Sequence, residues 1–405
     1  MRCRICMIEM MESKAVAYIG NFGFPNKNAS GKRVLGNCKA LQDLGYRVIC
    51  IGPGSDFGII DYDGIKAYTI NRGNEIERVV KNQMPLVERI LVDEDVQIVF
   101  LYGAIFTQKK NIQLIRWCHK KNILVIYDQV DWLDLNWHNP FRGLMRARNH
   151  SLMNNKVIPA CDGVICISSF LADYHTKKGS KAVVIPPLSI EQSKGLIQAY
   201  DVRKNRPLRL AYAGTTSDIH RPTYQWKDRL DIMFEKFLEA SSDASLRQFV
   251  IDIFGMTKEQ YLIMFPMSER AQGENVINQL GNKVAFHGSV PNIQAMEGIR
   301  RADFTILIRD KKRATMAGFP TKVSESISCC TPVLCNDTSD IKQYIVEGKT
   351  GYVMNDISQM LRIVLKLNAE EIAEMKKACL NNPFHYSCFV SPLQQFIQQL
   401  SDLNK

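Results

Sequence analysis

Several features that would identify common classes of protein are missing from this sequence. Its 12 cysteines include one Cys-x2-Cys spacing, Cys3 to Cys6, with no second pair and no His pair to complete a zinc site, so reduced thiols are expected. No apolar run is long enough to span a bilayer or to form the core of a secretory signal. Repeats and low-complexity tracts are also missing. We therefore expect a globular protein in the cytoplasm.

Size and composition favour two ordinary globular domains. A chain of 405 residues exceeds what one hydrophobic core usually supports, and 46% hydrophobic with 23% charged residues is a globular balance. The formal net charge of +11 is uneven, with +8 in residues 1–200 and +3 in the remainder. The basic first half fits phosphates or an anionic membrane surface better than nucleic acid, which is not expected as a partner. A merely solvated basic face is the alternative.

Short β-branched runs alternate with longer amphipathic stretches, the pattern of parallel sheets with crossover helices. In the first half the expected strands are 15–19, 48–51, 98–102, 124–127, 163–167 and 182–185, and the expected helices are 31–44, 76–92, 109–120 and 141–158. A polar stretch at 190–207 is the expected linker. The pattern then restarts, with strands at 208–213, 249–254, 283–286, 304–308, 331–335 and 351–354.

This alternation predicts an α/β protein with two Rossmann-like domains facing a central cleft. In open parallel sheets the ligand lies at the carboxyl ends of the strands, so the residues after each strand are the candidates for a site. The expected division is an extension at 1–11, a first domain at 12–200, a second at 201–383 and a terminal helix at 384–405 that crosses back to the first domain.

A loop with several glycines, residues 20–33, follows the first expected strand and runs into a helix. Its glycines permit close backbone approach, the free amides of the first helical turn attract an anion, and Lys32 and Arg33 add positive charge. The loop has neither the ending of a Walker loop nor a clean dinucleotide fingerprint, and a plain strand-to-helix turn is the alternative. The predicted acceptor or phosphate loop consists of Gly23, Ser30, Gly31 and Lys32.

The second half opens in the same way, because Gly214 directly follows a strand and Arg221 and Lys227 come soon after it. This arrangement suits a pyrophosphate lying on the loop, although the two cations are equally well explained as surface charges. Residues 306–335 then combine a strand, a basic loop, a helix start with Pro320 in its first turn, and Glu325 about one turn later. A carboxylate at that place can accept hydrogen bonds from the vicinal hydroxyls of a ribose.

In the order and spacing of its motifs, the chain resembles the retaining glycosyltransferases of the GT-B fold, of the family-four type that includes bacterial polysaccharide enzymes. The resemblance covers nearly the whole chain. It rests on the first glycine loop, the segment 160–169, Tyr212-Ala-Gly214, the segment 284–290, the Phe-Pro-Thr-Lys run ending at Lys322 with Glu325 and Thr-Pro-Val, and Glu347-Gly-Lys-Thr-Gly351.

The resemblance implies a role for individual residues. Glu325 takes the place of the family's ribose-binding Glu. The Arg that usually follows the glycine is Thr215 here, so Arg221 or Lys227 must supply that charge. Arg309 and Lys322 match a subgroup of the family in which a strand ends in Arg and the next helix begins with Pro-Ser/Thr/Val-Lys. The implied donor-binding set is Gly214, Thr215, Arg221, Lys227, His287, Arg309, Lys322, Val323 and Glu325, and the implied catalytic residues are Asp131 and Lys322.

The implied reaction is transfer of a sugar from a nucleotide-sugar to a saccharide or lipid-linked acceptor, with retention of configuration and without a metal or other cofactor. Fixed cations would stabilise the departing diphosphate. The surface-polysaccharide pathway is the expected context. Asp61-Tyr-Asp63 has the letters of a metal-binding Asp-x-Asp motif, but Gly64 follows it and a hairpin turn is expected instead.

Two departures from the family pattern keep other functions open. Ala317 replaces the first Glu of the family's Glu-x7-Glu pair, and Pro186-Pro-Leu188 stands where Pro-Asn-Gly is common. The alternatives are a non-catalytic partner subunit of the same fold and a nucleotide-sugar epimerase. Trp132 and Trp137 fit either an acceptor sugar or an aromatic cluster, and the basic helix surface 142–148 fits either anionic lipid or solvent.

Overall fold

The structure is a computed structural model, which describes residues 14–25, 28–71, 83–104, 107–132, 140–190, 206–215 and 219–403. The chain divides into two compact units. Unit 1 comprises Met1–Ile190 together with Tyr386–Lys405, and unit 2 comprises Glu191–His385. The sequence placed these boundaries at 200/201 and 383/384. Residues 1–11 and most of the expected linker lie outside the described residues.

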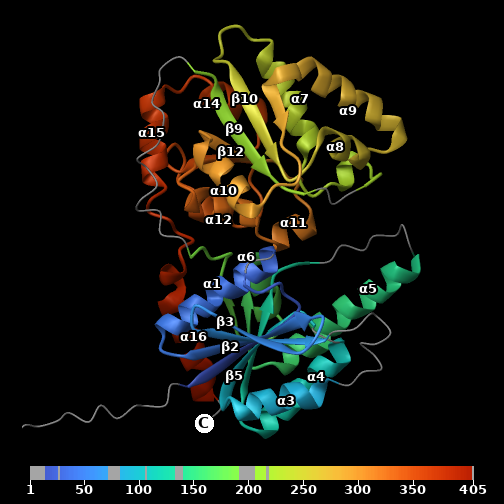
Figure 1. The fold of residues 1–405 in the computed structure, drawn as a ribbon, viewed down its shortest axis with the longest axis vertical. Helices are drawn as coiled ribbons and strands as arrows, with labels where there is room; N and C mark the ends of the chain where they lie inside the picture. The colour runs from blue at the N-terminus through green and yellow to red at the C-terminus, as the bar shows by residue number, and fades with distance from the viewer. Residues whose placement is uncertain are drawn as a thin grey trace, which may run out of the picture. The chain divides into compact units, whose positions relative to one another are not determined.

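Unit 1 is built on one eight-stranded sheet in the order β3-β4-β2-β1-β5-β6-β7-β8 (Figure 1). Its strands are β1 (Ala15–Gly20), β2 (Arg47–Gly54), β3 (Gly58–Tyr62), β4 (Ile65–Asn71), β5 (Val96–Tyr102), β6 (Leu124–Gln129), β7 (Gly163–Cys166) and β8 (Ala182–Val184). All neighbouring pairs are parallel except β3 with β4. The alternating βα sequence therefore produces the parallel sheet that it predicts.

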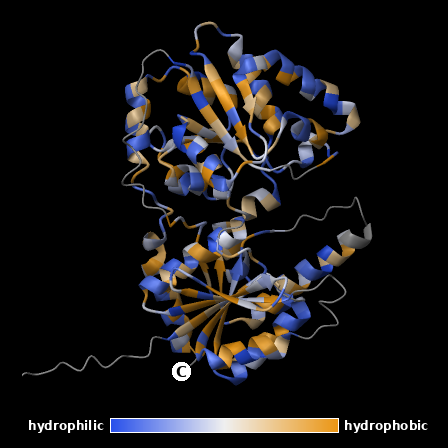
Figure 2. Ribbon diagram, in the orientation of Figure 1, coloured by the Kyte–Doolittle hydropathy of each residue, from blue (hydrophilic) through white to orange (hydrophobic). Residues whose placement is uncertain are grey.

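The helices of unit 1 are α1 (Ala29–Asp43), α3 (Met84–Asp93), α4 (Gln108–Lys120), α5 (Pro140–Leu152), α6 (Ser169–Thr176) and α16 (Val390–Leu403). Of these, α1, α4, α6 and α16 contact strands of the sheet. One core cluster joins Tyr18 of β1, Val34 of α1 and Phe396 of α16. Figure 2 shows the strands as hydrophobic and the surrounding helices as mixed, as expected when the sheet is covered on its faces.

Helix α16 is the last element of the chain and completes the core of unit 1. The Tyr386 amide donates to the Ser189 carbonyl at 3.0 Å just before the helix begins. Gly163 of β7 leaves room for it, because a Cβ atom there would lie 2.7 Å from the Phe396 ring and 2.8 Å from Leu400. Unit 1 is therefore formed from two segments that are far apart in the sequence.

Unit 2 has a six-stranded parallel sheet in the order β11-β10-β9-β12-β13-β14. Its strands are β9 (Leu208–Ala213), β10 (Phe249–Phe254), β11 (Val284–Phe286), β12 (Phe304–Leu307), β13 (Val333–Cys335) and β14 (Gly351–Val353). Its helices are α7 (Leu230–Ser241), α8 (Lys258–Met264), α9 (Met267–Leu280), α10 (Asn292–Arg301), α11 (Arg313–Ala317), α12 (Thr321–Ser328), α13 (Ile341–Tyr344), α14 (Ile357–Val364) and α15 (Ala369–Ala378).

The predicted fold class is confirmed, and the twelve expected strands are present with bounds that differ by at most three residues. Strands β3 and β4 were not expected, but the predicted turn at Asp61-Tyr-Asp63 does join them. Asp63 and Gly64 both have positive φ, 54° and 74°, as a two-residue hairpin turn with the twist of the flanking strands requires. Among the described helices, none combines the length and the apolar character needed to cross a membrane.

Candidate functional site

Three glycine turns lie side by side at the carboxyl ends of β9, β10 and β11. The Gly214 amide donates to the Phe254 carbonyl at 2.9 Å, and the Gly255 amide donates to the Gly288 carbonyl at 2.8 Å. Gly255 has φ +95°, and a Cβ atom at this position would lie 2.6 Å from the Gly214 oxygen. These strand ends therefore approach each other more closely than residues with side chains would allow.

A carboxylate that is mostly buried binds two of the predicted cations beside these turns. Asp228, which the sequence analysis did not single out, accepts from Arg309 Nε at 2.6 Å and from the Tyr212 hydroxyl at 2.7 Å. Lys322 Nζ lies 2.9 Å from Asp228 Oδ2, the oxygen that also accepts from Tyr212, and 5.2 Å from the centroid of the Tyr212 ring. Arg309 and Lys322 therefore meet on a side chain of the protein, and their contact with a donor diphosphate stays a prediction.

Electrostatics keep this cluster charged. Burial alone would raise the pKa of Asp228, but Lys322, Arg309 and the Tyr212 hydroxyl together hold it well below its usual range. Burial and the Asp228 charge raise the pKa of Tyr212, which stays a neutral donor. Two cations around one anion leave a net positive charge. The Lys322 side chain is 26% exposed and that of Arg309 is 5% exposed, so Lys322 is the cation within reach of a ligand.

Helix α12 positions Lys322 and Glu325. Pro320 precedes the helix, Lys322 is in its first turn, and Glu325 follows at i+3 and so shares a face of the helix with Lys322. Val323, the predicted neighbour in the donor set, is fully buried and anchors the opposite side of the helix. Lys322, Glu325 and Tyr212 line one recess bounded by residues of β9 and β12.

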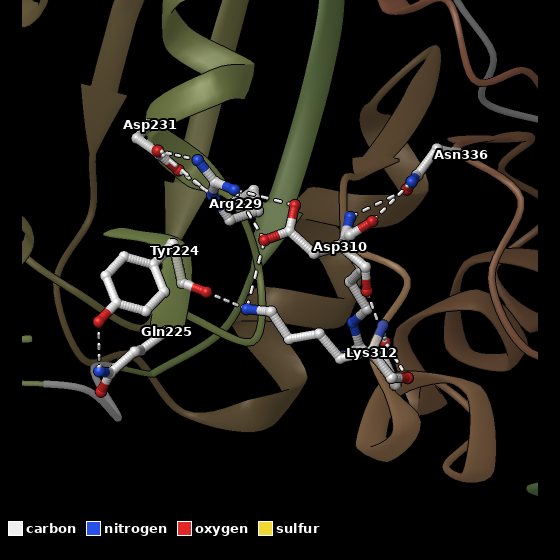
Figure 3. Close-up of polar contacts among 9 residues, drawn as sticks. Tyr224, Gln225, Arg229, Asp231, Asp310, Lys312 and Asn336 are labelled. Carbon is white, nitrogen blue, oxygen red and sulfur yellow. Dashed lines mark hydrogen bonds and ion pairs between the residues drawn. The ribbon is translucent and has the colours of Figure 1, made fainter. Parts of the chain in front are cut away.

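The segment that follows β12 is held by hydrogen bonds of its backbone and by ion pairs. Asn336 accepts from the Arg309 amide at 2.9 Å and donates to the Arg309 carbonyl at 2.6 Å. Figure 3 shows that the next residue, Asp310, faces the guanidinium of Arg229, with Nη1 at 2.8 and 2.7 Å from its two oxygens. Arg229 also binds Asp231, so one guanidinium connects two carboxylates. These contacts fix the loop that carries Arg309.

The remaining residues of the predicted donor set are Arg221, Lys227, Thr215 and His287. The backbone of Arg221 bonds to the Met264 carbonyl at 2.9 Å and accepts from the Trp226 indole at 3.0 Å. Lys227 is exposed and directly precedes Asp228, whereas Thr215 is exposed beside Gly214. His287 lies 2.7 Å from Asp252 and stacks on the Phe254 ring at 4.5 Å, next to the turn at Gly288.

The predicted loop of unit 1 is closed by its own side chains. Asn28 caps α1: its Oδ1 accepts from the Gly31 amide at 2.9 Å and from the Ser30 hydroxyl at 2.6 Å. A Cβ atom on Gly31 would lie 2.0 Å from the Gly23 carbonyl oxygen, so these two glycines are needed for the turn itself. The Lys32 amide bonds to the Asn28 carbonyl at 3.0 Å. The Asn28 side chain thus accepts from donors that an anion would otherwise use. This favours the alternative of a plain strand-to-helix turn.

The charge that the sequence analysis assigned to this loop at Arg33 is wrongly placed. Arg33 is 3% exposed and binds the buried Asp128 of β6 at 2.7 Å, while its Nη1 donates to the Ile185 carbonyl at 2.9 Å. Tyr18 also donates to Asp128. Because an uncompensated buried carboxylate is costly, Asp128 attracts the guanidinium into the core and away from solvent.

Asp131, the predicted catalytic residue of unit 1, is exposed just beyond the end of β6. The neighbouring Trp132 makes edge-to-face contacts with His150 at 4.6 Å and Tyr174 at 4.9 Å, and this favours an aromatic cluster as its role. Trp137 lies outside the described residues. Ala317 is fully buried on α11.

Asp228 is the principal site residue that sequence reasoning missed. A signal was available, since two cations expected to meet at one strand edge require a counter-ion when no ligand is bound. The carboxylate directly after Lys227 follows the same strand as Gly214. Tyr212 was noted only as part of a motif, and Asn336 has no signal in the sequence.

Part of the chain matches a known protein family. Residues 237–379 match the model for glycosyl transferases group 1. The matched segment lies within unit 2 and contains His287, Arg309, Lys322, Val323 and Glu325. No curated protein matches the sequence significantly.

Solved structures match nearly the whole chain in fold. Sucrose-phosphate synthase from Thermosynechococcus elongatus has a TM-score of 0.63 at 14% identity, over 96% of this chain and 100% of its own. A glycosyltransferase from Rickettsia africae has a TM-score of 0.61 at 14% identity, over 96% and 99%. Anabaena HepE in complex with UDP-glucose has a TM-score of 0.56 at 14% identity, over 96% and 99%. The two parallel-sheet domains thus have the GT-B fold.

Proposed function

We propose that this chain is a retaining, metal-independent glycosyltransferase that transfers a sugar from a nucleotide-sugar to a saccharide or lipid-linked acceptor in the cytoplasm, in surface polysaccharide biosynthesis. The observation that carries the proposal is the Asp228 cluster with Glu325 beside it. Lys322 and Glu325 lie in the segment that matches glycosyl transferases group 1. The UDP and UDP-glucose complexes of Anabaena HepE support a nucleotide-sugar as the donor class.

In the proposed reaction the bond between the anomeric carbon and the diphosphate oxygen breaks, and the diphosphate leaves with the electron pair. Lys322 exchanges its contact with Asp228 for a phosphate oxygen and stabilises the charge that develops there. Arg309 stays buried against Asp228 and holds Asp228 in place beside Lys322. This role is narrower than the direct contact with phosphate that the family resemblance implies for Arg309. The acceptor hydroxyl then bonds to the anomeric carbon on the face that the diphosphate left and gives its proton to the departing diphosphate. Asp131 is the proposed catalytic residue of unit 1.

The proposal is tested by measuring the melting temperature of the purified chain with a panel of nucleotide-sugars, followed by transfer assays with the donor that binds. A donor that binds only the folded state raises the melting temperature. Binding without transfer or donor hydrolysis would favour the non-catalytic subunit, the alternative to which the buried Ala317 points. Conversion of the donor without any acceptor would favour an epimerase.

Glu325→Gln should weaken nucleotide binding, because the variant loses the charge that strengthens hydrogen bonds from the ribose hydroxyls. A loss of about tenfold corresponds to one charge-assisted hydrogen bond. Calorimetric titration of wild type and variant with the same nucleotide measures it. Glu347→Gln makes the same change of side chain in the Glu-Gly-Lys-Thr-Gly turn and serves as the control. Equal affinities of wild type and Glu325→Gln would remove Glu325 from the ribose site.

Transfer should continue in EDTA, because fixed basic side chains take the role that a divalent cation has in metal-dependent enzymes. Initial rates with and without chelator, at matched ionic strength, should agree within error. Activity that disappears in EDTA and returns with manganese would show that the proposed metal-independent mechanism is wrong.

We also propose that unit 1 contacts an anionic membrane surface through α5. Leu144 and Met145 are 64% and 52% exposed on this helix, and Arg146 and Arg148 are exposed beside them. Exposed apolar side chains next to arginines suit the boundary between lipid headgroups and acyl chains. Co-sedimentation with vesicles containing phosphatidylglycerol, compared with neutral vesicles, tests this contact.

A further inference from the structure

Unit 2 contains a cavity of about 230 Å³ that none of the proposed donor residues lines. It lies among α7, α8, α9 and the 3-10 turn Thr223–Gln225. The residues that matter for its chemistry are Thr223, Asp231, Glu235, Tyr261, Phe265 and Glu269. A water molecule occupies about 30 Å³ in the liquid, so the cavity has room for a small organic molecule.

The cavity is acidic. Three carboxylates line it, and no lysine, arginine or histidine does. Asp231 is 8% exposed, and its Oδ2 lies 2.7 Å from Arg229 Nη2. Glu235 accepts a hydrogen bond from the amide side chain of Gln272 at 3.1 Å, and Glu269 accepts from the Thr223 amide at 3.5 Å. Within the described part of the chain, neither glutamate has an ion-pair partner.

Tyr261 provides a second, independent sign of a ligand. Its side chain is 1% exposed and lines the cavity, where its hydroxyl is accessible and makes no hydrogen bond to another residue in the described part of the chain. Burial and the charges of Asp231 and Glu235 raise the Tyr261 pKa, so the hydroxyl stays neutral. Buried polar groups are normally paired with protein, water or a ligand. The Phe265 ring packs edge-on at 5.2 Å and adds an apolar wall.

We propose that this cavity binds a small aliphatic amine, with its ammonium group between Glu235 and Glu269 and its alkyl part against Tyr261 and Phe265. An ammonium donates three hydrogen bonds, and carboxylates and a tyrosine oxygen accept them. Aromatic faces favour a nearby cation. In the described ranges no three His, Cys, Asp or Glu side chains are placed to share one metal ion, so the acidic walls suit an extended cation better than a bare one.

The amine site is connected to the proposed donor site through Arg229. This guanidinium binds Asp231 at the cavity and Asp310 in the loop that follows Arg309 (Figure 3). An ammonium near Asp231 competes for that carboxylate and leaves more of the Arg229 charge to Asp310. The added positive charge favours a bound diphosphate, and linkage requires that the diphosphate favours the amine by the same factor. This connection rests on the proposed function, whereas the amine site itself does not.

Calorimetric titration of the full chain with 1,4-diaminobutane tests the site, with 1,4-butanediol as a neutral molecule of similar shape. Wild type should bind the diamine and not the diol. The double variant Glu235→Gln/Glu269→Gln should bind at least about tenfold more weakly, the loss expected for charge-assisted hydrogen bonds. Glu374→Gln, whose side chain is 75% exposed on α15, should bind like wild type.

Three results would each overturn the site. The first is that wild type binds no diamine, and the second is that it binds the diol and the diamine equally. The third is an unchanged diamine affinity in the double variant, provided that its circular dichroism matches wild type. Tyr261→Phe, which keeps the packing, should also weaken binding. For the connection, UDP affinity should rise about fivefold in saturating diamine. Unchanged UDP affinity would overturn the connection. If UDP fails to bind at all, the proposed function fails, and the diamine titration still decides the site.

Discussion

Replacing Lys322 with methionine should lower the turnover number by about 10²-fold and raise the Michaelis constant much less. The side chain is the more accessible of the two cations in the Asp228 cluster, and methionine keeps nearly its length without its charge. The diphosphate gains negative charge as the glycosidic bond breaks, so the lost interaction is stronger in the transition state than in the ground state. Steady-state kinetics with a saturating acceptor measure the effect.

Lys311→Met is a matched control, because Lys311 is in the loop after β12 and pairs at the surface with Asp337 at 3.2 Å. It should leave turnover nearly unchanged. If Lys322 only compensates the Asp228 charge, the Lys322→Met variant will show a lower melting temperature with normal turnover. That result would remove Lys322 from the reaction.

Arg33→Met should destabilise unit 1 by about 3–5 kcal/mol, because the variant leaves the Asp128 carboxylate buried without its partner. Both side chains are almost inaccessible, at 2% and 0% exposure. The unfolding transition of unit 1 should fall by roughly 10 °C in scanning calorimetry, since 1 kcal/mol corresponds to about 2–4 °C in a domain of this size.

The double variant Arg33→Met/Asp128→Leu removes both charges and should recover much of the lost stability, because two apolar side chains replace a buried ion pair. A transition of the single variant within about 2 °C of wild type would show that water or local rearrangement compensates Asp128. The pair would then contribute little to the stability of the unit.

The sequence predicts the two sheets well because their strands are buried on both faces and are therefore continuous apolar runs, as at Val16, Val99 and Ile251. Strands β3 and β4 were missed because β3 is an edge strand with Ile59 and Ile60 exposed, so it has no alternating pattern. The hairpin turn between them was recognised from Asp63 and Gly64, since local turn chemistry does not depend on tertiary contacts.

The site was predicted less completely, because partners distant in sequence decide which charged groups are buried. In Tyr127-Asp-Gln-Val-Asp, both aspartates follow the same apolar run, and the distant partners Arg33 and Tyr18 distinguish the buried Asp128 from Asp131. Arg309 and Lys322 were assigned to the site through the family resemblance. Their common partner Asp228 is 81 residues from Arg309, and no local pattern reports that contact.

The division of unit 1 into two segments has a consequence for how the chain folds during synthesis. Residues 191–385 interrupt it, so the ribosome completes unit 2 before it makes the helix that contains Phe396 and Leu400. Until then, the surface of β7 around Gly163 has no covering helix, and a nascent chain carries this apolar patch while unit 2 is already able to fold. Chaperone binding to stalled nascent chains should therefore persist through residue 385 and decrease once α16 has left the exit tunnel.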